Sequence, residues 1–199
     1  MYFMMCGVGI FRGARVRKAP AVAPEDTASF CLGLTAYGML TSGALKKGDT
    51  VVHDISAGPL ATAVAAVAKE LGVTLTDKVD TKGAAMAITT TPGSKLAKCL
   101  GANGTLIACA DKESSTAIGA SQSISVSDVV FNNISTVGFD LPGYIANADE
   151  DTLNKAFTAV EGLVKGKKIG VTGKVYSTTD AAGAVKAAAE GKEVPVIKF

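Results

Sequence analysis

The hydrophobic pattern of residues 48–72 predicts a strand, a loop and a helix in succession. The β-branched run 50–52 follows a turn, and a loop of small residues, 56–58, comes after it. Four aliphatic residues then recur at the helical period: Leu60, Val64, Val67 and Leu71. One face of this helix is therefore expected to be buried. Gly72 follows, where a glycine commonly ends a helix.

The rest of the chain alternates between predicted helices and strands. Helices are predicted for four segments: 24–41, 92–100, 149–166 and 180–191. Strands are predicted for six: 73–75, 84–88, 105–110, 169–171, 174–176 and 194–199. Residues 101–104 read as a turn before the strand that follows them. Strands that alternate with helices indicate an α/β fold with a parallel, doubly wound sheet.

The loop after the first strand departs from the glycine-rich pattern of dinucleotide sites. Strand, loop and helix form the first half of a nucleotide-binding βαβ unit, whose glycines let the backbone approach a pyrophosphate. Here proline at the first helical position removes one N–H donor, and the next residues add side chains where the pyrophosphate would lie. We interpret the loop as vestigial and expect no cofactor there; an intact dinucleotide site is the alternative. Its residues are Ser56, Ala57, Gly58, Pro59, Leu60 and Ala61.

Composition argues against several classes of function. The 199 residues suit one domain, or one domain and a fragment, and 48% hydrophobic residues suffice for a core. No apolar run reaches the length of a transmembrane helix. A net charge of +2, with both signs mixed along the chain, argues against nucleic-acid binding. Trp is absent and aromatics are 6%, so a base-stacking surface is not expected.

Cysteine and histidine spacing predicts no metal site. The four cysteines lie far apart, at Cys6, Cys31, Cys99 and Cys109, and no C-x-x-C pair occurs. We expect reduced thiols, with Cys99 and Cys109 in the core. His53, the single histidine, reads as a loop or core residue in preference to a catalytic base.

The first 20 residues are basic, with no acidic residue before Glu25. Such composition is compatible with a mitochondrial presequence and with mature structure, and we interpret the segment as retained. Its basic cluster is expected to be a solvated face, with partner contact as the alternative. The cluster comprises Arg12, Arg15, Arg17 and Lys18.

Four stretches resemble, in order, the medium-chain dehydrogenase/reductase superfamily: 34–40, 47–52, 101–107 and 125–141. Within it the chain is similar to mitochondrial trans-2-enoyl thioester reductases, the NADPH enzymes of mitochondrial fatty-acid synthesis. The resemblance covers nearly the whole chain from Gly7. It implies a Rossmann-like sheet with remnants of a GroES-like catalytic domain at both termini. It also divides the chain into 1–33, a catalytic-domain remnant and linker; 34–165, a degenerate cofactor domain; and 166–199, C-terminal strands and a helix of the remnant.

Three departures from this family bear on activity. The tyrosine that assists proton delivery in the family has no counterpart, and Tyr37, which matches a cofactor-domain tyrosine, is expected to be a packing residue. The loop at 58–61 replaces the family's Ser-Gly-Val-Gly. Of the family's basic clamp for the NADPH 2′-phosphate, only Lys78 and Lys82 remain, among Asp77 and Asp80.

We therefore expect a noncatalytic accessory subunit of a large mitochondrial assembly, with respiratory complex I as first choice by analogy. It is placed on the matrix side, peripheral to the inner membrane, with other protein subunits as partners and no catalytic or metal-binding residue. The alternative is an NADPH-dependent 2-enoyl thioester reductase of mitochondrial fatty-acid synthesis, so enzymatic activity stays open. Terminal strands that lack neighbours are expected to contact partners. The expected contacts are Phe11, Arg12, Arg15, Arg17, Val175 and Ile197.

Overall fold

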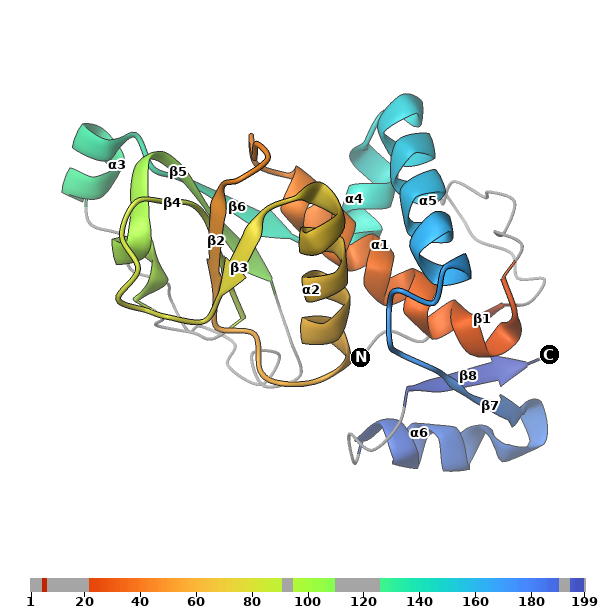
Figure 1. The fold of residues 1–199 in the computed structure, drawn as a ribbon. Coiled ribbons are helices and arrows are strands. Elements are labelled where there is room, and N and C mark those ends of the chain that lie inside the picture. Colours follow the sequence, from red (N-terminus) through yellow and green to blue (C-terminus); the bar gives the residue numbers. More distant parts are fainter. Residues whose placement is uncertain (1–4, 7–21, 91–94, 110–125, 190–193, 199) are drawn as a thin grey trace.

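The computed structural model describes residues 5–6, 22–90, 95–109, 126–189 and 194–198 (Figure 1). Its larger sheet has five parallel strands in the order β3-β2-β4-β5-β6. These strands are β2 (Thr50–His53), β3 (Thr74–Thr76), β4 (Ala84–Thr89), β5 (Leu100–Cys109) and β6 (Ser135–Phe139). The fold is thus the Rossmann-like α/β arrangement that the sequence predicts.

Helix α2 (Pro59–Leu71) forms where the periodicity predicts it. Proline opens the helix, and Gly72 ends it in a left-handed conformation with φ of 71°. Val64 and Val67 are fully buried, while Leu60 and Leu71 are half-buried against the same core. The predicted apolar face is therefore the face that packs on the sheet.

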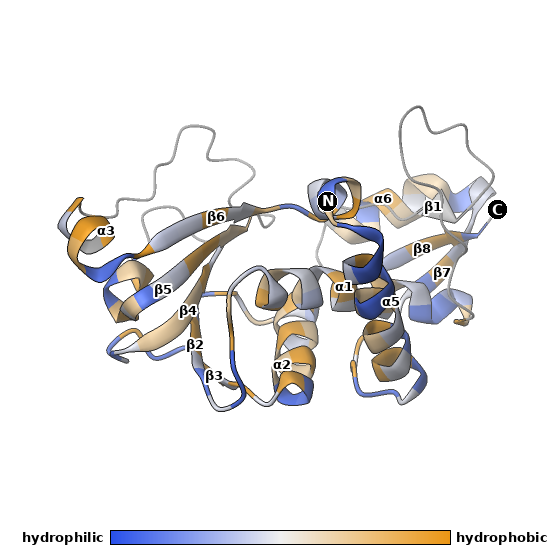
Figure 2. Ribbon diagram, turned by 90° about the horizontal axis from the view of Figure 1, so that it is seen from above, coloured by the Kyte–Doolittle hydropathy of each residue, from blue (hydrophilic) through white to orange (hydrophobic). Residues whose placement is uncertain are grey.

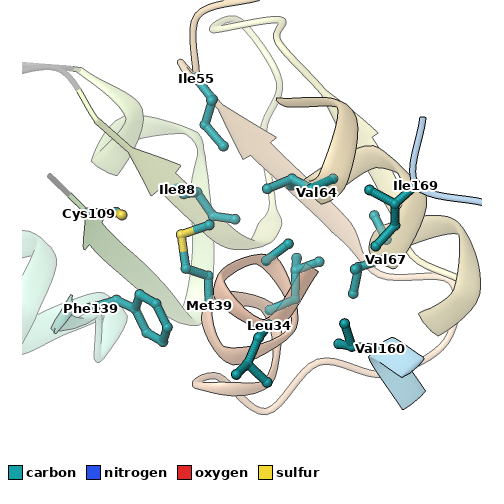
Figure 3. Packing of buried hydrophobic residues seen from close by; sticks show 14 of the residues in the cluster. Leu34, Met39, Ile55, Val64, Val67, Ile88, Cys109, Phe139, Val160 and Ile169 are labelled. Atoms are coloured by element: carbon teal, nitrogen blue, oxygen red, sulfur yellow. The ribbon is translucent and has the colours of Figure 1, made fainter. Parts of the chain in front are cut away.

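Two hydrophobic clusters cover the two faces of this sheet. Val51 and Ile107 face the larger cluster, which α1 (Thr27–Thr41), α2 and α5 (Glu150–Lys165) complete. Figure 3 shows Met39 of α1 beside Ile88 and Phe139. Val52 and Leu106, which are next to Val51 and Ile107 in the sequence, face the opposite side and belong to a second cluster, completed by the 3₁₀-helix η2 (Leu96–Cys99). This alternation follows from the two-residue period of a strand.

Close approach of α1 to its neighbours depends on glycine at two positions. A Cβ at Gly33 would lie 2.6 Å from Ile169 and 2.8 Å from Val160, whereas one at Gly38 would lie 2.6 Å from the Phe139 ring. Helix α4 (Leu141–Asn147), which follows β6, also contacts α1. The two glycines let α1 lie close to α5 and to the end of β6, and on its other side α1 contacts α2 (Figure 1).

Two secondary-structure predictions are wrong, and a third is only partly described. The turn expected at 101–104 is an irregular part of β5, where the pairing with β4 shifts and Asn103 has φ of 62°. The short helix expected at 92–100 is present as η2, which ends just before Leu100, and residues 92–94 lie outside the described part of the chain. No strand forms at 169–171; Ile169 and Val171 instead fill the core as irregular chain. In the two wrong predictions, at 101–104 and 169–171, tertiary packing overrides the local pattern.

A second, three-stranded parallel sheet combines segments from both ends of the chain, in the order β1-β8-β7. Its strands are β1 (Met5–Cys6), β7 (Lys174–Ser177) and β8 (Pro195–Lys198), which lie together in Figure 1. The short helices η1 (Pro24–Asp26) and η4 (Thr178–Asp180) and the longer α6 (Ala181–Ala189) accompany it, and α3 (Val126–Asn132) lies against β5. None of the helices in the described part of the chain is long and apolar enough to cross a membrane. The proposed division at 33/34 and 165/166 stays a prediction; its first boundary falls inside α1.

Candidate functional site

The strand order of the larger sheet reverses beside β2. From β2 the chain passes to β3 on one side and then returns to β4 on the other. Open α/β sheets bind ligands outside the carboxyl ends of their strands at such a reversal. The segment 54–58, which leads from β2 into α2, lies at this point and defines the candidate site.

The backbone before α2 is open to an approaching ligand. A Cβ built on Gly58 would meet nothing nearer than the Ser56 carbonyl oxygen at 4.0 Å, and Pro59 is exposed. No side chain caps the helix, whose first bond runs from the Thr62 N–H to the Gly58 carbonyl at 3.0 Å. The N–H groups of residues 60 and 61 precede that bond, so they lack an acceptor within the helix. A helix N-terminus of this kind attracts anions.

The side chain of Leu60 does not occupy this opening. Leu60 and Ala61 are half-buried and pack against the large core cluster. This packing argues against the expectation that both side chains lie in the path of a pyrophosphate. The loss of one donor at Pro59 remains, because proline has no N–H.

Asp54 joins the carboxyl ends of β2 and β4. Its Oδ2 accepts a hydrogen bond from the Thr89 hydroxyl at 2.7 Å, and its Oδ1 accepts one from the Thr90 N–H at 2.7 Å. The Asp54 N–H itself donates to the Ile88 carbonyl at 3.2 Å. Thr89 and Thr90 are 1% and 3% exposed. This group of hydrogen bonds, here called the Asp54 clasp, holds the two strands together at the strand-order reversal.

His53 lies opposite Asp77, which directly follows the neighbouring strand β3. Val52 pairs with Thr76, so the next residue on each chain, His53 and Asp77, leaves the same edge of the sheet. The His53 Nδ1 accepts a hydrogen bond from the Ile55 N–H at 3.2 Å. Burial lowers the pKa of His53, while the carboxylates of Asp77 and Asp54 act in the opposite direction. His53 is thus a half-buried strand-end residue, as its interpretation as a loop or core residue implies.

The loop 77–83 carries the two lysines that the sequence leaves near a 2′-phosphate position. The Lys82 ammonium donates to the Lys98 carbonyl at 3.1 Å. The backbone N–H of Lys78 donates to the Thr76 hydroxyl at 3.2 Å, and the Lys78 side chain is exposed. The Lys82 ammonium therefore helps to hold this loop in place. The Lys78 side chain extends from the loop into solvent.

Other predicted residues lie away from this site. Tyr37 is half-buried and packs against the large core cluster. Cys31, Cys99 and Cys109 are thiols outside any disulfide, and the last two are buried, as predicted. No group of His, Cys, Asp and Glu in the described ranges could hold a metal ion.

The expected partner-contact residues are only partly described. Phe11, Arg12, Arg15 and Arg17 lie outside the described residues, as do Lys18 and the other residues of 7–21. On the three-stranded sheet, Val175 is 39% exposed and Ile197 is half-buried. The sequence analysis assigned no role to Asp54, Thr89 or Thr90. The position of Asp54, a polar residue directly after a buried strand, could have indicated such a role.

No protein-family model and no curated protein matches this sequence. Solved structures do match it. The T175V mutant of Etr1p, in complex with NADP and crotonyl-CoA, has a TM-score of 0.62 at 14% identity, over 86% of this chain and 60% of that one. A mutant enoyl thioester reductase from Candida tropicalis has a TM-score of 0.62 at 16% identity, over 84% and 59%. The yhdH oxidoreductase of Salmonella enterica, in complex with NADP, has a TM-score of 0.59 at 15% identity, over 85% and 61%.

These structures show that the chain has the fold of the medium-chain dehydrogenase/reductases, which the sequence resemblance implies. Enoyl thioester reductases are among the structures that share it. The chain spans about 60% of the length of these structures. At such low identity the likeness concerns the fold, and activity remains a matter for proposal.

The expectation that no cofactor is bound is contradicted by the same comparison. Two of the similar structures, the Etr1p mutant and yhdH, are complexes with NADP. The physical reason lies in the loop: Gly58 faces open space and Leu60 packs inward, so the features interpreted as obstruction leave the N-terminus of α2 accessible.

Proposed function

We propose that this chain binds a nicotinamide adenine dinucleotide at the carboxyl edge of its larger sheet and serves the reduction of a 2-enoyl thioester. The observation that carries the proposal is the open backbone at Gly58, which faces the uncapped N-terminus of α2 at the strand-order reversal. Support also comes from the similar structures that hold NADP, one of them together with crotonyl-CoA. The proposed setting is mitochondrial fatty-acid synthesis.

The described residues fit the pyrophosphate of such a dinucleotide. Gly58 permits close approach of the backbone, and the N–H groups of Leu60 and Ala61 point along the axis of α2 toward the anion. Pro59 supplies no donor, so binding is expected to be weaker than in a loop that offers every N–H. When bound, the dinucleotide supplies the hydride for reduction.

The substrate class is proposed by analogy. A 2-enoyl thioester is the ligand class represented by crotonyl-CoA in the Etr1p complex. The part played by the chain itself is to place the dinucleotide at the end of β2, where the Asp54 clasp holds the ends of β2 and β4 together.

A binding measurement with a matched pair of glycine variants tests the proposal. Because the chain lacks Trp, NADPH binding is followed by calorimetry or by the fluorescence of the nicotinamide. Gly58→Val adds a side chain where the structure has room for it, so the protein folds but the pyrophosphate is blocked. Gly138→Val on β6, where a Cβ also meets nothing within 4 Å, is the control.

The native chain and Gly138→Val are expected to bind whichever of NADH and NADPH is preferred with a dissociation constant in the micromolar range. Gly58→Val is expected to bind at least about tenfold more weakly. Absence of saturable binding by the folded native chain, for both NADPH and NADH, would exclude the proposed function. Equal affinity of the two variants would show that the dinucleotide binds elsewhere.

A second candidate function, the accessory subunit of a mitochondrial assembly, is favoured by exposed apolar side chains. Helix α3 presents four of them, and Phe131 is 83% exposed. Figure 2 shows α3, partly orange, at one end of the larger sheet. The four residues are Val126, Val129, Val130 and Phe131. Apolar patches of this kind commonly mark contacts with other proteins.

In this second proposal the chain lies on the matrix side, peripheral to the inner membrane, among other protein subunits. Purification from mitochondria under mild conditions should recover the chain in a large assembly, and identification of its partners by mass spectrometry would name the host. Recovery of the chain alone, together with cooperative folding as a monomer at high concentration, would remove this candidate.

A further inference from the structure

The end of β3 carries a carboxylate where a bound dinucleotide would place its adenosine ribose. Asp77 follows β3 directly and stands about 20 residues after Gly58. In dinucleotide-binding α/β sheets, the residue at the end of the second strand contacts the 2′ position of that ribose. An acidic side chain there accepts a hydrogen bond from a 2′-hydroxyl, whereas a cation accommodates a 2′-phosphate.

The surroundings of Asp77 leave its negative charge available to the ligand. It is exposed and faces His53 across the β2–β3 pair, and no ion pair in the described chain involves it. Burial lowers the pKa of His53, and the Asp77 carboxylate only partly opposes this effect. His53 is therefore a neutral neighbour near pH 7 and does not cancel the charge of Asp77.

The lysines nearby provide an incomplete phosphate clamp. The Lys82 ammonium donates a hydrogen bond to the Lys98 carbonyl. Lys78 is an exposed cation that lies in the sequence between Asp77 and Asp80. Lys78 is the next residue after Asp77, so the carboxylate would repel a 2′-phosphate that binds beside this lysine.

We infer that Asp77 accepts a hydrogen bond from the 2′-hydroxyl of the adenosine ribose, so that this chain selects NAD(H) over NADP(H). The inference rests on the proposed function, because it concerns the same dinucleotide site. It assigns Asp77 as the residue that determines the choice of dinucleotide, and it separates this chain from the similar structures that hold NADP.

Affinities of NADH and NADPH for three proteins test the inference. The native chain is expected to bind NADH at least about tenfold more tightly than NADPH. Asp77→Asn removes the charge at an exposed position. It should reduce the ratio of NADH affinity to NADPH affinity, mainly by improving NADPH binding. Asp80→Asn, an equally exposed carboxylate in the same loop, should leave the ratio unchanged.

Each outcome has a distinct meaning. Tighter binding of NADPH than of NADH, lost in Lys78→Gln, would overturn the inference and assign Lys78 as a phosphate contact while leaving the proposed function intact. An unchanged ratio in Asp77→Asn would also overturn it. If neither dinucleotide binds the folded native chain, the proposed function fails and the inference fails with it.

Discussion

Replacement of Asp54 by alanine is expected to destabilise the larger sheet at the point where β2 and β4 end. The side chain accepts two hydrogen bonds of 2.7 Å, from the Thr89 hydroxyl and the Thr90 N–H. Both threonines are almost completely buried, so water has little access to the donor groups after the substitution. Hydrogen bonds to a charged acceptor each stabilise by about 1.5–3 kcal/mol.

Two such hydrogen bonds together would stabilise by about 3–6 kcal/mol, and we expect the loss in Asp54→Ala to lie at the lower end of this range. Asp54 is partly exposed, and a hydroxyl such as that of Thr89 can rotate toward another acceptor. We expect a loss of about 3 kcal/mol, chiefly from the Thr90 N–H that loses its acceptor. For a chain of this size, each kcal/mol lowers Tm by about 2–4 °C, so the expected shift is about 6–12 °C.

Urea unfolding followed by far-UV circular dichroism measures this loss. Asp54→Asn keeps the size of the side chain and an oxygen for the Thr90 N–H, and its amide can donate to the Thr89 hydroxyl, so it should lose less than about half as much. Asp49→Ala is a control for removal of a carboxylate, because the Asp49 side chain accepts, among the described residues, only from the Lys46 N–H in a turn. If Asp54→Ala cost less than about 1 kcal/mol, or no more than Asp49→Ala, the clasp would not stabilise the sheet as argued.

Three further predictions follow from buried groups and from glycine packing. The pKa of His53 lies below its ordinary value of about 6.5 because burial disfavours the imidazolium, so the unfolded chain binds more protons and stability should fall as pH is lowered through that value. Urea unfolding across pH 5–8 should show this fall in the native chain and a flatter profile in His53→Gln. Burial raises the pKa of Cys31 to about 11, so iodoacetamide should alkylate it far more slowly in the native chain than in urea, and equal rates in peptide mapping would contradict its burial. Gly38→Ala should lower the free energy of unfolding by about 1–3 kcal/mol, because the added methyl group contacts Phe139. Gly162→Ala, in open space on α5, should raise the free energy of unfolding by about 0.5–1 kcal/mol. A change of the same sign in both variants would refute the packing argument.

The sequence alone was sufficient wherever a local pattern and a burial requirement agree. The apolar period of α2 and the glycine after it place this helix to within a residue or two, and the acidic start and apolar stripe of α5 do the same. Asp149, which caps α5 by accepting from the Thr152 N–H at 2.8 Å, lies at the predicted start. In such segments the signal lies within a few turns of the chain.

The site was predictable only in its position. The strand, loop and helix order places a ligand site at the end of β2, but the effect of Pro59 and Leu60 was judged from their sizes alone. Whether a side chain obstructs a ligand depends on the direction in which it leaves the backbone. Leu60 packs on the core because the helix turns that face toward the sheet.

Tertiary structure decided which distant residues meet. Thr90 lies 36 residues after Asp54 in sequence, and the two come together only because β4 pairs with β2 on the side away from β3. The same pairing order places His53 opposite Asp77, and β1 meets β8 although they stand at opposite ends of the chain. Strand order and register depend on the packing of whole elements, which local periodicity does not encode. The sequence therefore determined periodic elements such as α2 and α5 and the edge at which a ligand would bind, and the fold determined the charges and hydrogen bonds that such a ligand would meet.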